Sequence, residues 1–478
     1  MASEKTLNAK NLAALGAERL AELLLELATG DAAAKRRLRL ELASRSGGSD
    51  VAAEIRKRLV SIAKSRSFVD WRKIKPLALD IEMLRAAIMQ HVAPTKPAEA
   101  FDLLWRLLEM APSIYERCDD NNGTISGVIR VALSDLGVIA EQAALAPSPL
   151  ADRVFQGVCT NDYGQYDDLI ALMAKPLGRE GLEILKARFV ELAAKPTARP
   201  TRGERRVIGY GSGGPIFDED DYEARNHART VQSALTDIAD ALGDVDAYAM
   251  CFSMEELANP AIAARIAERL LGANRADEAL AALTAAEEQR HKGAHWSDWQ
   301  RVWIDTLDAL GRSDDAQAER WTIFERNLNA QYLRAYIKRL PDFDDEEAEI
   351  RALAYVGEHP DFNQALAFLV EWPAHDLAAK LILTRQGELD GNHYELLTPA
   401  AEALEQRHPF AATLMLRAMI DYSLIHARHK RYGHAARHLQ TCEHLAKRVE
   451  NFGDRRDHAA YLAHLRRLHG RKSGFWNA

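Results

Sequence analysis

The chain has 478 residues and a mass of 53.3 kDa, which is more than one hydrophobic core usually serves, so a single compact bundle is excluded. Its 47% hydrophobic and 28% charged residues, with a net charge of -8, are typical of a folded protein and exclude wholesale disorder. No apolar stretch approaches the ~18 residues that cross a bilayer, and Met1 to Lys10 lack the apolar core of a secretory signal. We therefore expect a cytoplasmic protein with no membrane partner.

The N-terminal part of the chain has the pattern of consecutive helices. Alanine and leucine are abundant, and β-branched residues never alternate over the length of a strand. Between Leu12 and Leu27 the leucines recur at spacings of three and four, which places them on one face of a helix that Gly30 ends. The same pattern predicts helices over 32–46, 50–66, 71–92, 97–110, 124–145, 149–160 and 179–195.

The helical pattern stops after residue 195. Residues 196–222 are rich in glycine and proline and end in four acidic residues, which predicts a Gly/Pro-rich acidic loop or linker between an N-terminal helical superhelix (1–195) and a C-terminal repeat domain (223–478). The glycine run Gly209–Gly214 resembles a phosphate-binding loop only weakly, because Pro215 and acidic residues follow it instead of Lys-Ser/Thr. A loop that docks on the helices or on a partner is the other interpretation.

The C-terminal part shows a weak internal repeat. Asn274–Ala279 and Gly311–Ala316 align at a spacing of 37, and each has a tight turn followed by a small residue where two helices can cross closely. Looser copies occur at 360–365 and 430–435. The predicted fold is therefore an all-α solenoid of irregular helical hairpins, tetratricopeptide-like in the C-terminal half.

Three stretches of the N-terminal half carry a family resemblance. Phe68–Trp71, Cys118–Ile125 and Pro149–Phe155 together resemble the helical region that follows the zinc finger in bacterial SWIM-domain proteins. With Asn161–Asp167 included, the chain is similar to a bacterial helical-repeat family of unknown function over most of residues 5–470. The resemblance implies a helical fold and no particular activity. The finger's Cys-x-Cys and Cys-x-His pairs are missing, so zinc-dependent nucleic-acid binding is not implied.

Two polar segments are interpreted as turns. Asp119–Thr124 can accept backbone N–H bonds and cap the next helix, with a calcium loop as the alternative, although the spacing of EF-hand ligands is absent. Asn161–Asp167 is interpreted as a tyrosine-packed turn between helices, with presentation of its tyrosines to a partner as the alternative.

The chain lacks recognisable catalytic chemistry. No nucleophile elbow or dinucleotide fingerprint is present, and the four cysteines are too far apart to indicate a disulfide framework or a zinc site. We therefore predict a non-enzymatic protein with no catalytic residue and no cofactor. His426, His434 and His438 have spacings that permit a metal, but the surrounding arginine and lysine residues oppose a divalent cation, so no metal ligand is assigned.

Charge is distributed unevenly. The net charge is +7 over residues 1–75, -22 over 76–400 and +7 over 401–478. Arg36, Arg39 and Arg58 are predicted to line one basic face near the N-terminus, and Arg466 and Arg467 lie on the last long helix. Such basic ends suit a phosphate backbone, or an acidic protein surface of the same or another protomer.

Aromatic residues suggest a second contact surface. Trp296, Trp299 and Trp303 follow helical spacing, and although most of such a ridge is expected to be core, an exposed first member would be an anchor for a peptide. The first hypothesis is a non-enzymatic protein–protein interaction scaffold that binds an extended peptide or helix in a groove, using the tryptophans and the basic ends. The alternatives are a nucleic-acid-associated accessory protein and a metal-binding or enzymatic protein using the histidines. The sequence indicates no oligomeric state.

Overall fold

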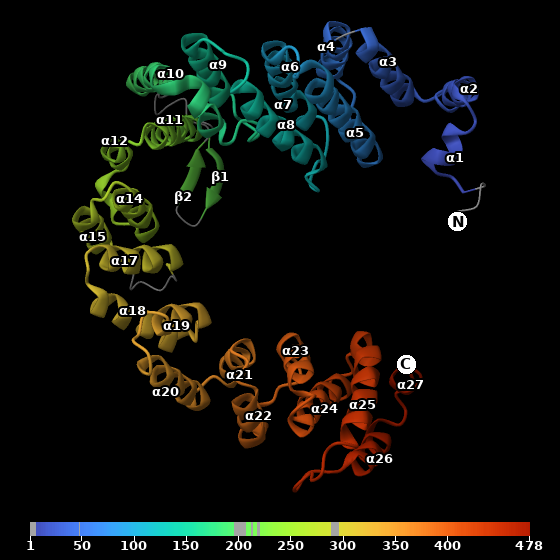
Figure 1. Cartoon of the computed structure of the whole chain (residues 1–478), viewed down its shortest axis with the longest axis vertical. Coiled ribbons are helices and arrows are strands. Elements are labelled where there is room, and N and C mark those ends of the chain that lie inside the picture. The colour runs from blue at the N-terminus through green and yellow to red at the C-terminus, as the bar shows by residue number, and fades with distance from the viewer. Residues whose placement is uncertain (1–5, 47, 196–206, 212–213, 218–219, 288–295) are drawn as a thin grey trace. The chain divides into compact units, whose positions relative to one another are not determined.

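The computed structural model describes residues 6–46, 48–195, 207–211, 214–217, 220–287 and 296–478. Its contacts divide the chain into two compact units, Met1–Ala273 and Asn274–Ala478. Within each unit, helices joined by short turns pack on their neighbours in chain order (Figure 1). The predicted architecture of irregular helical hairpins is confirmed.

The first unit contains fifteen helical segments and one pair of strands among its described residues. They are α1 Ala9–Ala13, α2 Ala17–Leu27, α3 Ala32–Ser46, α4 Gly48–Lys64, α5 Trp71–Ala87, the π-helix η1 Ile88–Val92, α6 Pro97–Glu109, α7 Ala111–Tyr115, α8 Thr124–Ala140, α9 Pro147–Cys159, α10 Leu169–Ala194, β1 Val207–Gly211, β2 Gly214–Phe217, α11 Asp220–Leu242, α12 Val245–Met250, α13 Met254–Leu257 and α14 Pro260–Gly272.

Every regular element of the second unit among its described residues is a helix. Its elements are α15 Ala276–Ala285, α17 Ser297–Ala309, α18 Ser313–Asn327, α19 Ala330–Ile337, α20 Asp344–Glu358, α21 Phe362–Glu371, α22 His375–Thr384, the 3-10 helix η2 Gln386–Glu388, α23 Tyr394–Leu404, α24 Pro409–Ile425, the 3-10 helix η3 His429–Arg431, α25 Tyr432–Ala446, α26 His458–His469 and α27 Ser473–Trp476.

The predicted helices of the first unit are found within a few residues of their expected bounds. The prediction for 32–46 coincides with α3, and that for 97–110 differs from α6 by one residue. The prediction for 179–195 covers only the second part of α10. This helix begins at Leu169 and is interrupted at Gly178, whose φ of 57° is not helical. A glycine adopts such a left-handed conformation at little steric cost, so it marks the kink.

The predicted loop 196–222 contains a β-hairpin. β1 pairs antiparallel with β2, with Val207 opposite Phe217 and Gly211 opposite Gly214. The Val, Ile, Tyr and Phe residues within this glycine-rich stretch favour strands, a tendency that the helical reading of the chain overlooked. The remaining residues of the predicted loop, 196–206, 212–213 and 218–219, lie outside the described residues.

The boundary between the two units differs from the sequence-based division. The contacts divide the chain after Ala273, whereas residues 196–222 were expected to separate the domains. The reason is that α11, which follows the hairpin, packs on α10 and α9. Its Ala234 and Ile238 belong to the same hydrophobic core as the preceding helices.

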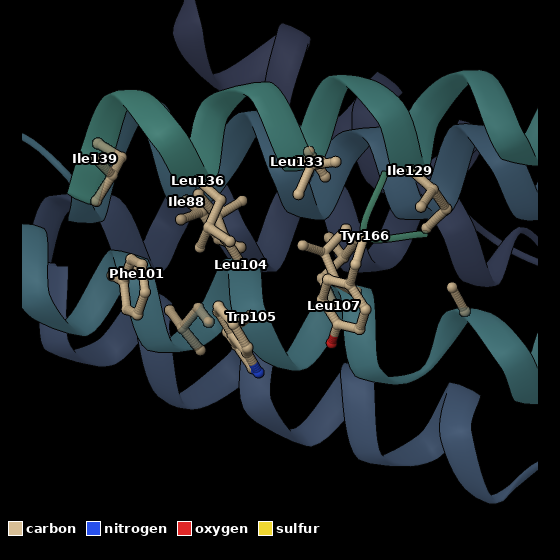
Figure 2. Close-up of a cluster of buried hydrophobic side chains, with 14 of the residues drawn as sticks. Ile88, Phe101, Leu104, Trp105, Leu107, Ile129, Leu133, Leu136, Ile139 and Tyr166 are labelled. Carbon is tan, nitrogen blue, oxygen red and sulfur yellow. The ribbon is translucent and has the colours of Figure 1, made fainter. Parts of the chain in front are cut away.

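The core of the first unit is formed by helix faces with three- and four-residue spacing. On α8, Ile129, Leu133 and Leu136 are at most 5% exposed, and Figure 2 shows them pointing toward the side chains of α6. Trp105 of α6 is 2% exposed, and its ring centroid lies 5.5 Å from that of Tyr166. These interlocking side chains fix neighbouring hairpins against each other.

Both polar segments of this unit form turns. Asp120 accepts hydrogen bonds from the backbone N–H groups of Ile125 at 2.9 Å and Ser126 at 2.8 Å, and so caps α8. Burial opposes ionisation, yet these hydrogen bonds outweigh it and lower the pKa of Asp120. In the second turn, the Asn161 side chain bonds both Asp167 and the Tyr166 backbone N–H, each at 2.8 Å.

The repeat predicted in the second unit is present. Asn274 and Gly311, 37 residues apart, both have a positive φ, 59° and 72°, and each immediately precedes a new helix. Ala279 and Ala316, at the matching position five residues later, are fully buried. Within the unit, α15 and α18, which carry these alanines, both pack on α17, and a small side chain at this position permits close approach of helices.

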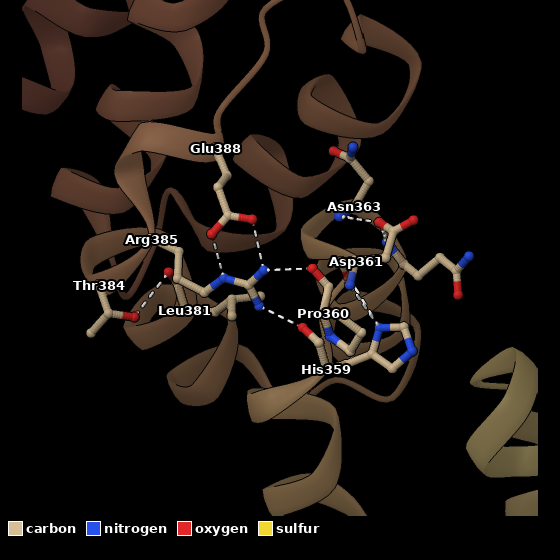
Figure 3. A network of polar contacts seen from close by, with 9 residues as sticks. His359, Pro360, Asp361, Asn363, Leu381, Thr384, Arg385 and Glu388 are labelled. Atoms are coloured by element: carbon tan, nitrogen blue, oxygen red, sulfur yellow. Dashed lines mark hydrogen bonds and ion pairs between the residues drawn. The ribbon is translucent and has the colours of Figure 1, made fainter.

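Arg385 joins two of these hairpins. Its guanidinium donates to the carbonyl oxygens of His359 at 2.6 Å and Pro360 at 2.9 Å, in the turn between α20 and α21. The same guanidinium holds the Glu388 carboxylate through two parallel bonds of 2.7 Å (Figure 3). The C-terminal α27 packs back on the unit, where Phe475 is 2% exposed against α25.

The core assignment of α8 predicts unequal effects of two neighbouring substitutions. Leu136→Ala removes a fully buried side chain, so we expect the free energy of unfolding to fall by about 3 kcal/mol. Val138→Ala, on the same helix but 53% exposed, should change it by less than about 0.5 kcal/mol. Urea unfolding followed by circular dichroism measures both values, and equal effects would contradict the described packing.

Candidate functional site

A small basic pocket lies on three helices of the first unit. It is lined by Arg36, Arg39 and Leu40 of α3, by Glu54, Lys57, Arg58 and Ser61 of α4, and by Leu84 of α5, and has a volume of about 180 Å³. We call it the arginine pocket. The lining residues of α3 and those of α4 recur at three- and four-residue spacings, so each set shares one face of its helix.

A buried carboxylate holds two of the arginines. Asp80 of α5 is 4% exposed. Its Oδ1 accepts a hydrogen bond from Arg36 Nε at 3.1 Å, and its Oδ2 accepts from Arg58 Nε at 2.9 Å and from Arg58 Nη2. The one carboxylate neutralises only one of the two guanidinium charges, so the cluster of Arg36, Asp80 and Arg58 has a net charge of about +1. The shared carboxylate also fixes both guanidinium groups in place.

Two further cations complete the rim of the pocket. Lys57 is exposed and donates to Glu54 at 2.7 Å, while the exposed Arg39 has no ion pair with a residue that the structure describes. Four cationic side chains therefore share two carboxylates, an excess of two positive charges. Leu40 and Leu84, which belong to the core, form the aliphatic floor of the pocket. This combination suits an anionic group carried on an apolar segment.

The structure brings the three predicted arginines together but gives them different roles. Arg36 and Arg58 are bound by Asp80, and their side chains are only 27% and 26% exposed. Arg39 alone of the three is free to meet a partner. Asp80 was not among the predicted site residues, although a lone acid within the apolar stripe of α5, near Ile81, is a signal that basic residues pack against it.

The tryptophan ridge is part of the interior. Trp299 is 1% exposed, its indole N–H donates to the Leu283 carbonyl at 3.3 Å, and its ring stacks on Trp303 at 4.9 Å. Trp299 therefore cannot serve as an exposed peptide anchor, which corrects that part of the prediction. Trp296 and Trp303 are half-buried. A binding role for these two residues stays a prediction.

The predicted C-terminal arginines are exposed on α26. The guanidinium of Arg466 lies 5.8 Å from the centre of the Trp476 ring, and Arg467 approaches His464 Nδ1 at 3.3 Å. Among the described residues, no buried carboxylate holds either arginine in the way that Asp80 holds Arg36. Their contribution to partner binding stays a prediction.

The predicted histidines do not converge. His426 packs on Tyr422 with ring centres 4.4 Å apart, His434 Nδ1 lies 2.9 Å from an Arg437 nitrogen, and burial lowers the pKa of His438. Over the residues that the structure describes, no group of three or more His, Cys, Asp or Glu side chains is close enough to hold a metal. In the same residues, no helix is both long and apolar enough to cross a membrane.

The Asp80 cluster predicts a specific stability effect. Asp80→Asn keeps the volume but removes the charge shared by Arg36 and Arg58, so we expect the free energy of unfolding to fall by about 2 kcal/mol. The control is Asp102→Asn, which weakens an exposed ion pair with Arg153 and should cost less than about 1 kcal/mol. Urea titrations compare the two, and an equal or smaller loss for Asp80→Asn would contradict the cluster's structural role.

Comparison with known proteins identifies a family but no relative of known function. No curated protein matches the chain. One solved structure that matches is a circular tandem repeat protein with novel repeat topology and enhanced subunit contact surfaces, at 12% identity over 94% of each chain, with a TM-score of 0.15. A score this low does not establish a common fold, so the architecture rests on this protein's own helices.

A family model describes the whole length of the chain. It is the Family of unknown function (DUF6880), and it matches residues 2–478. Its description names no zinc finger, so the resemblance to SWIM-domain proteins stays a prediction. With all its described helices inside the matched span, the chain belongs to this family of unknown function.

Proposed function

We propose that this protein is a non-enzymatic scaffold for protein–protein interaction, and that the arginine pocket binds an acidic, amphipathic segment of a partner. The observation that carries the proposal is the Arg36–Asp80–Arg58 cluster. This cluster carries a net positive charge. Because Asp80 already holds the side chains of Arg36 and Arg58 in place, these arginines lose little conformational entropy when a partner binds. Arg39 and Lys57, which are exposed, supply the cations that reach the partner first.

The lining of the pocket favours a peptide over a nucleic acid. Leu40 and Leu84, which are 7% and 1% exposed, form an aliphatic floor under the cations, for which a phosphate backbone has no complement. Glu54 places a carboxylate on the rim, where it repels phosphates but can pair with a basic residue of a peptide. The volume of about 180 Å³ is that of one or two side chains, which fits insertion of a leucine flanked by acidic residues.

Helical-repeat architecture supports the same role. Stacked hairpins present extended surfaces whose side chains vary without loss of the fold, because the core depends on the apolar faces alone. On two of the three helices that line the pocket, Val60 of α4 and Leu79 of α5 are 45% and 69% exposed, although neither residue lines the pocket itself. Exposed aliphatic residues on the same helices as exposed cations are typical of a protein contact surface.

Charge reversal in the pocket tests this function. The probes are a fluorescein-labelled 12-residue peptide with leucines at helical spacing and glutamates elsewhere, the same peptide with lysines replacing the glutamates, and a labelled 12-nucleotide single-stranded DNA. We expect the acidic peptide to bind, and the double variant Arg39→Glu, Lys57→Glu to weaken that binding about tenfold, because both side chains are exposed cations at the rim. Fluorescence anisotropy measures each dissociation constant.

The matched control is Lys73→Glu, an exposed cation on α5 that does not line the pocket, which should leave the affinity within about twofold of the original. Circular dichroism verifies that each variant folds. If only the DNA binds, with an affinity that falls steeply as salt rises, the protein is a nucleic-acid-binding protein and the proposal is wrong. Equal binding of the acidic and basic peptides also contradicts it.

A further inference from the structure

The second unit contains a larger cavity, separate from the arginine pocket. Its volume is about 390 Å³. Its lining comes from the turn between α22 and α23, from α24, from Arg455 and Arg456, and from Tyr461 of α26. One wall is tightly fixed, because a Cβ on Gly391 would lie 2.0 Å from the Ala418 carbonyl oxygen.

Arg417 is buried in this cavity with most of its hydrogen-bonding capacity unused. The residue is 7% exposed. Its Nη1 donates to the Arg456 carbonyl oxygen at 2.7 Å, but Nε and Nη2 have no hydrogen-bond partner among the described residues. The guanidinium lies 4.4 Å from the centre of the Tyr461 ring and 5.3 Å from that of Phe452. Aromatic contacts stabilise the positive charge but leave these N–H groups unsatisfied.

The unsatisfied nitrogens form the edge that recognises a carboxylate. The N–H bonds of Nε and Nη2 point the same way from the guanidinium plane, so they match two oxygens of one anion. The chain uses this edge elsewhere: Arg385 holds both oxygens of Glu388 through Nε and Nη2, each at 2.7 Å (Figure 3). Arg275 holds Glu278 in the same way, at 2.7 and 2.6 Å.

Asp421, one helical turn after Arg417, does not supply the missing carboxylate. Asp421 Oδ1 accepts a hydrogen bond from the Tyr461 hydroxyl at 2.7 Å, and it does not bind the Arg417 edge, since Nε and Nη2 have no hydrogen-bond partner among the described residues. Burial raises the pKa of Asp421. Arg455 and Arg456 are exposed at the same cavity and add positive charge, against the single exposed acid Asp390.

A second unsatisfied group lines the cavity. Gln386 Oε1 is buried and has no hydrogen-bond partner among the described residues, while its amide nitrogen donates to the Leu383 carbonyl at 2.9 Å. The cavity therefore has two unmet requirements of opposite kind. Arg417 requires an acceptor with two oxygens, and Gln386 requires a donor.

We propose that this cavity binds a carboxylate that carries a nearby N–H donor, with Arg417 holding the carboxylate and Gln386 accepting the N–H hydrogen bond. Two sources have this chemistry, the C-terminal residue of a peptide and a free N-acylated amino acid. The site is independent of the arginine pocket, because all its lining residues belong to the second unit.

Binding requires a local movement of side chains. Arg417 Nε and Nη2 are shielded from solvent, so the ligand reaches them only when the covering groups shift. Phe452 and the Arg456 carbonyl come from the segment between α25 and α26, which is without helix from 450 to 457. This segment is the part of the wall that can move at the lowest cost, because no helical hydrogen bonds hold it.

Small probes test the site in the full-length protein. Saturation-transfer difference NMR follows the acetyl methyl signal of N-acetylglycine, which has a carboxylate and an adjacent N–H, and of N-acetylglycinamide, which lacks the charge. Acetate and inorganic phosphate are titrated in competition. We expect saturable binding of N-acetylglycine, with the amide at least about tenfold weaker because it cannot satisfy the Arg417 edge. Acetate should also bind more weakly, because it leaves Gln386 unpaired.

The variants separate the roles of the two residues. Arg417→Lys keeps the charge but removes the two-pronged edge, and Gln386→Leu removes the acceptor; each should weaken N-acetylglycine at least about tenfold. The control Arg448→Lys alters an exposed arginine of the same unit that binds the Glu405 carbonyl at 3.1 Å, outside the cavity, and should change nothing. Arg455→Gln with Arg456→Gln, both on the exposed segment, should weaken binding about threefold without affecting the fold.

The outcomes divide clearly. A longer acetylated peptide acid that binds more than about tenfold tighter than N-acetylglycine identifies a peptide C-terminus, and equal affinity identifies a free acylated amino acid. Both results support the proposed chemistry. It is overturned if N-acetylglycine does not bind, if phosphate or acetate binds more tightly, or if folded Arg417→Lys binds as the original does. If Arg417→Lys does not fold, the test rests on Gln386→Leu and on the double variant of Arg455 and Arg456. Unchanged binding of N-acetylglycine by both folded variants then overturns the proposal.

Discussion

Each helical hairpin of this protein can bury its apolar face only against the next hairpin. A two-helix unit has no interior of its own, so Trp105 of α6 reaches Tyr166, sixty-one positions later, to complete its packing. Close approach of helices then depends on small residues. Ala279 and Ala316 occupy matching positions of the 37-residue repeat, Ala365 and Ala435 those of its looser, irregularly spaced copies, and all four are at most 1% exposed. This packing leaves the polar faces, and therefore function, largely free of the constraints of folding.

The turns between hairpins create a second requirement, which arginine meets. A helix ends with carbonyl groups that lack partners within the helix, and a guanidinium has five N–H donors to satisfy them. Arg117 donates to the carbonyls of Ser67 and Ile62, at 3.2 and 3.3 Å, and Arg448 to that of Glu405. Many of the chain's basic residues are consequently structural. Net charge by segment therefore overstates how much basic surface is available to a partner.

The helices were predictable from the sequence because their signals are local. Apolar spacing, a capping carboxylate such as Asp120 and a glycine at the end of a segment lie within a few residues of the feature that they determine. The two-unit division was not predictable, because it depends on which faces of α9, α10 and α11 meet across the glycine-rich hairpin. The site was partly predictable. Spacing placed Arg36, Arg39 and Arg58 on one surface, but their pairing with Asp80 requires three helices to come together.

The distinction between structural and functional arginines depends on what satisfies each guanidinium. Arg385 and Arg58 have their carboxylates within the chain, so their positive charges are already used in folding. Arg39 retains its charge at the surface at little cost, because water solvates it. Arg417 is different, since it is removed from water and no carboxylate of the described chain faces its free edge. A buried charge of this kind destabilises the unliganded protein, and a ligand that supplies the missing carboxylate recovers that free energy as affinity.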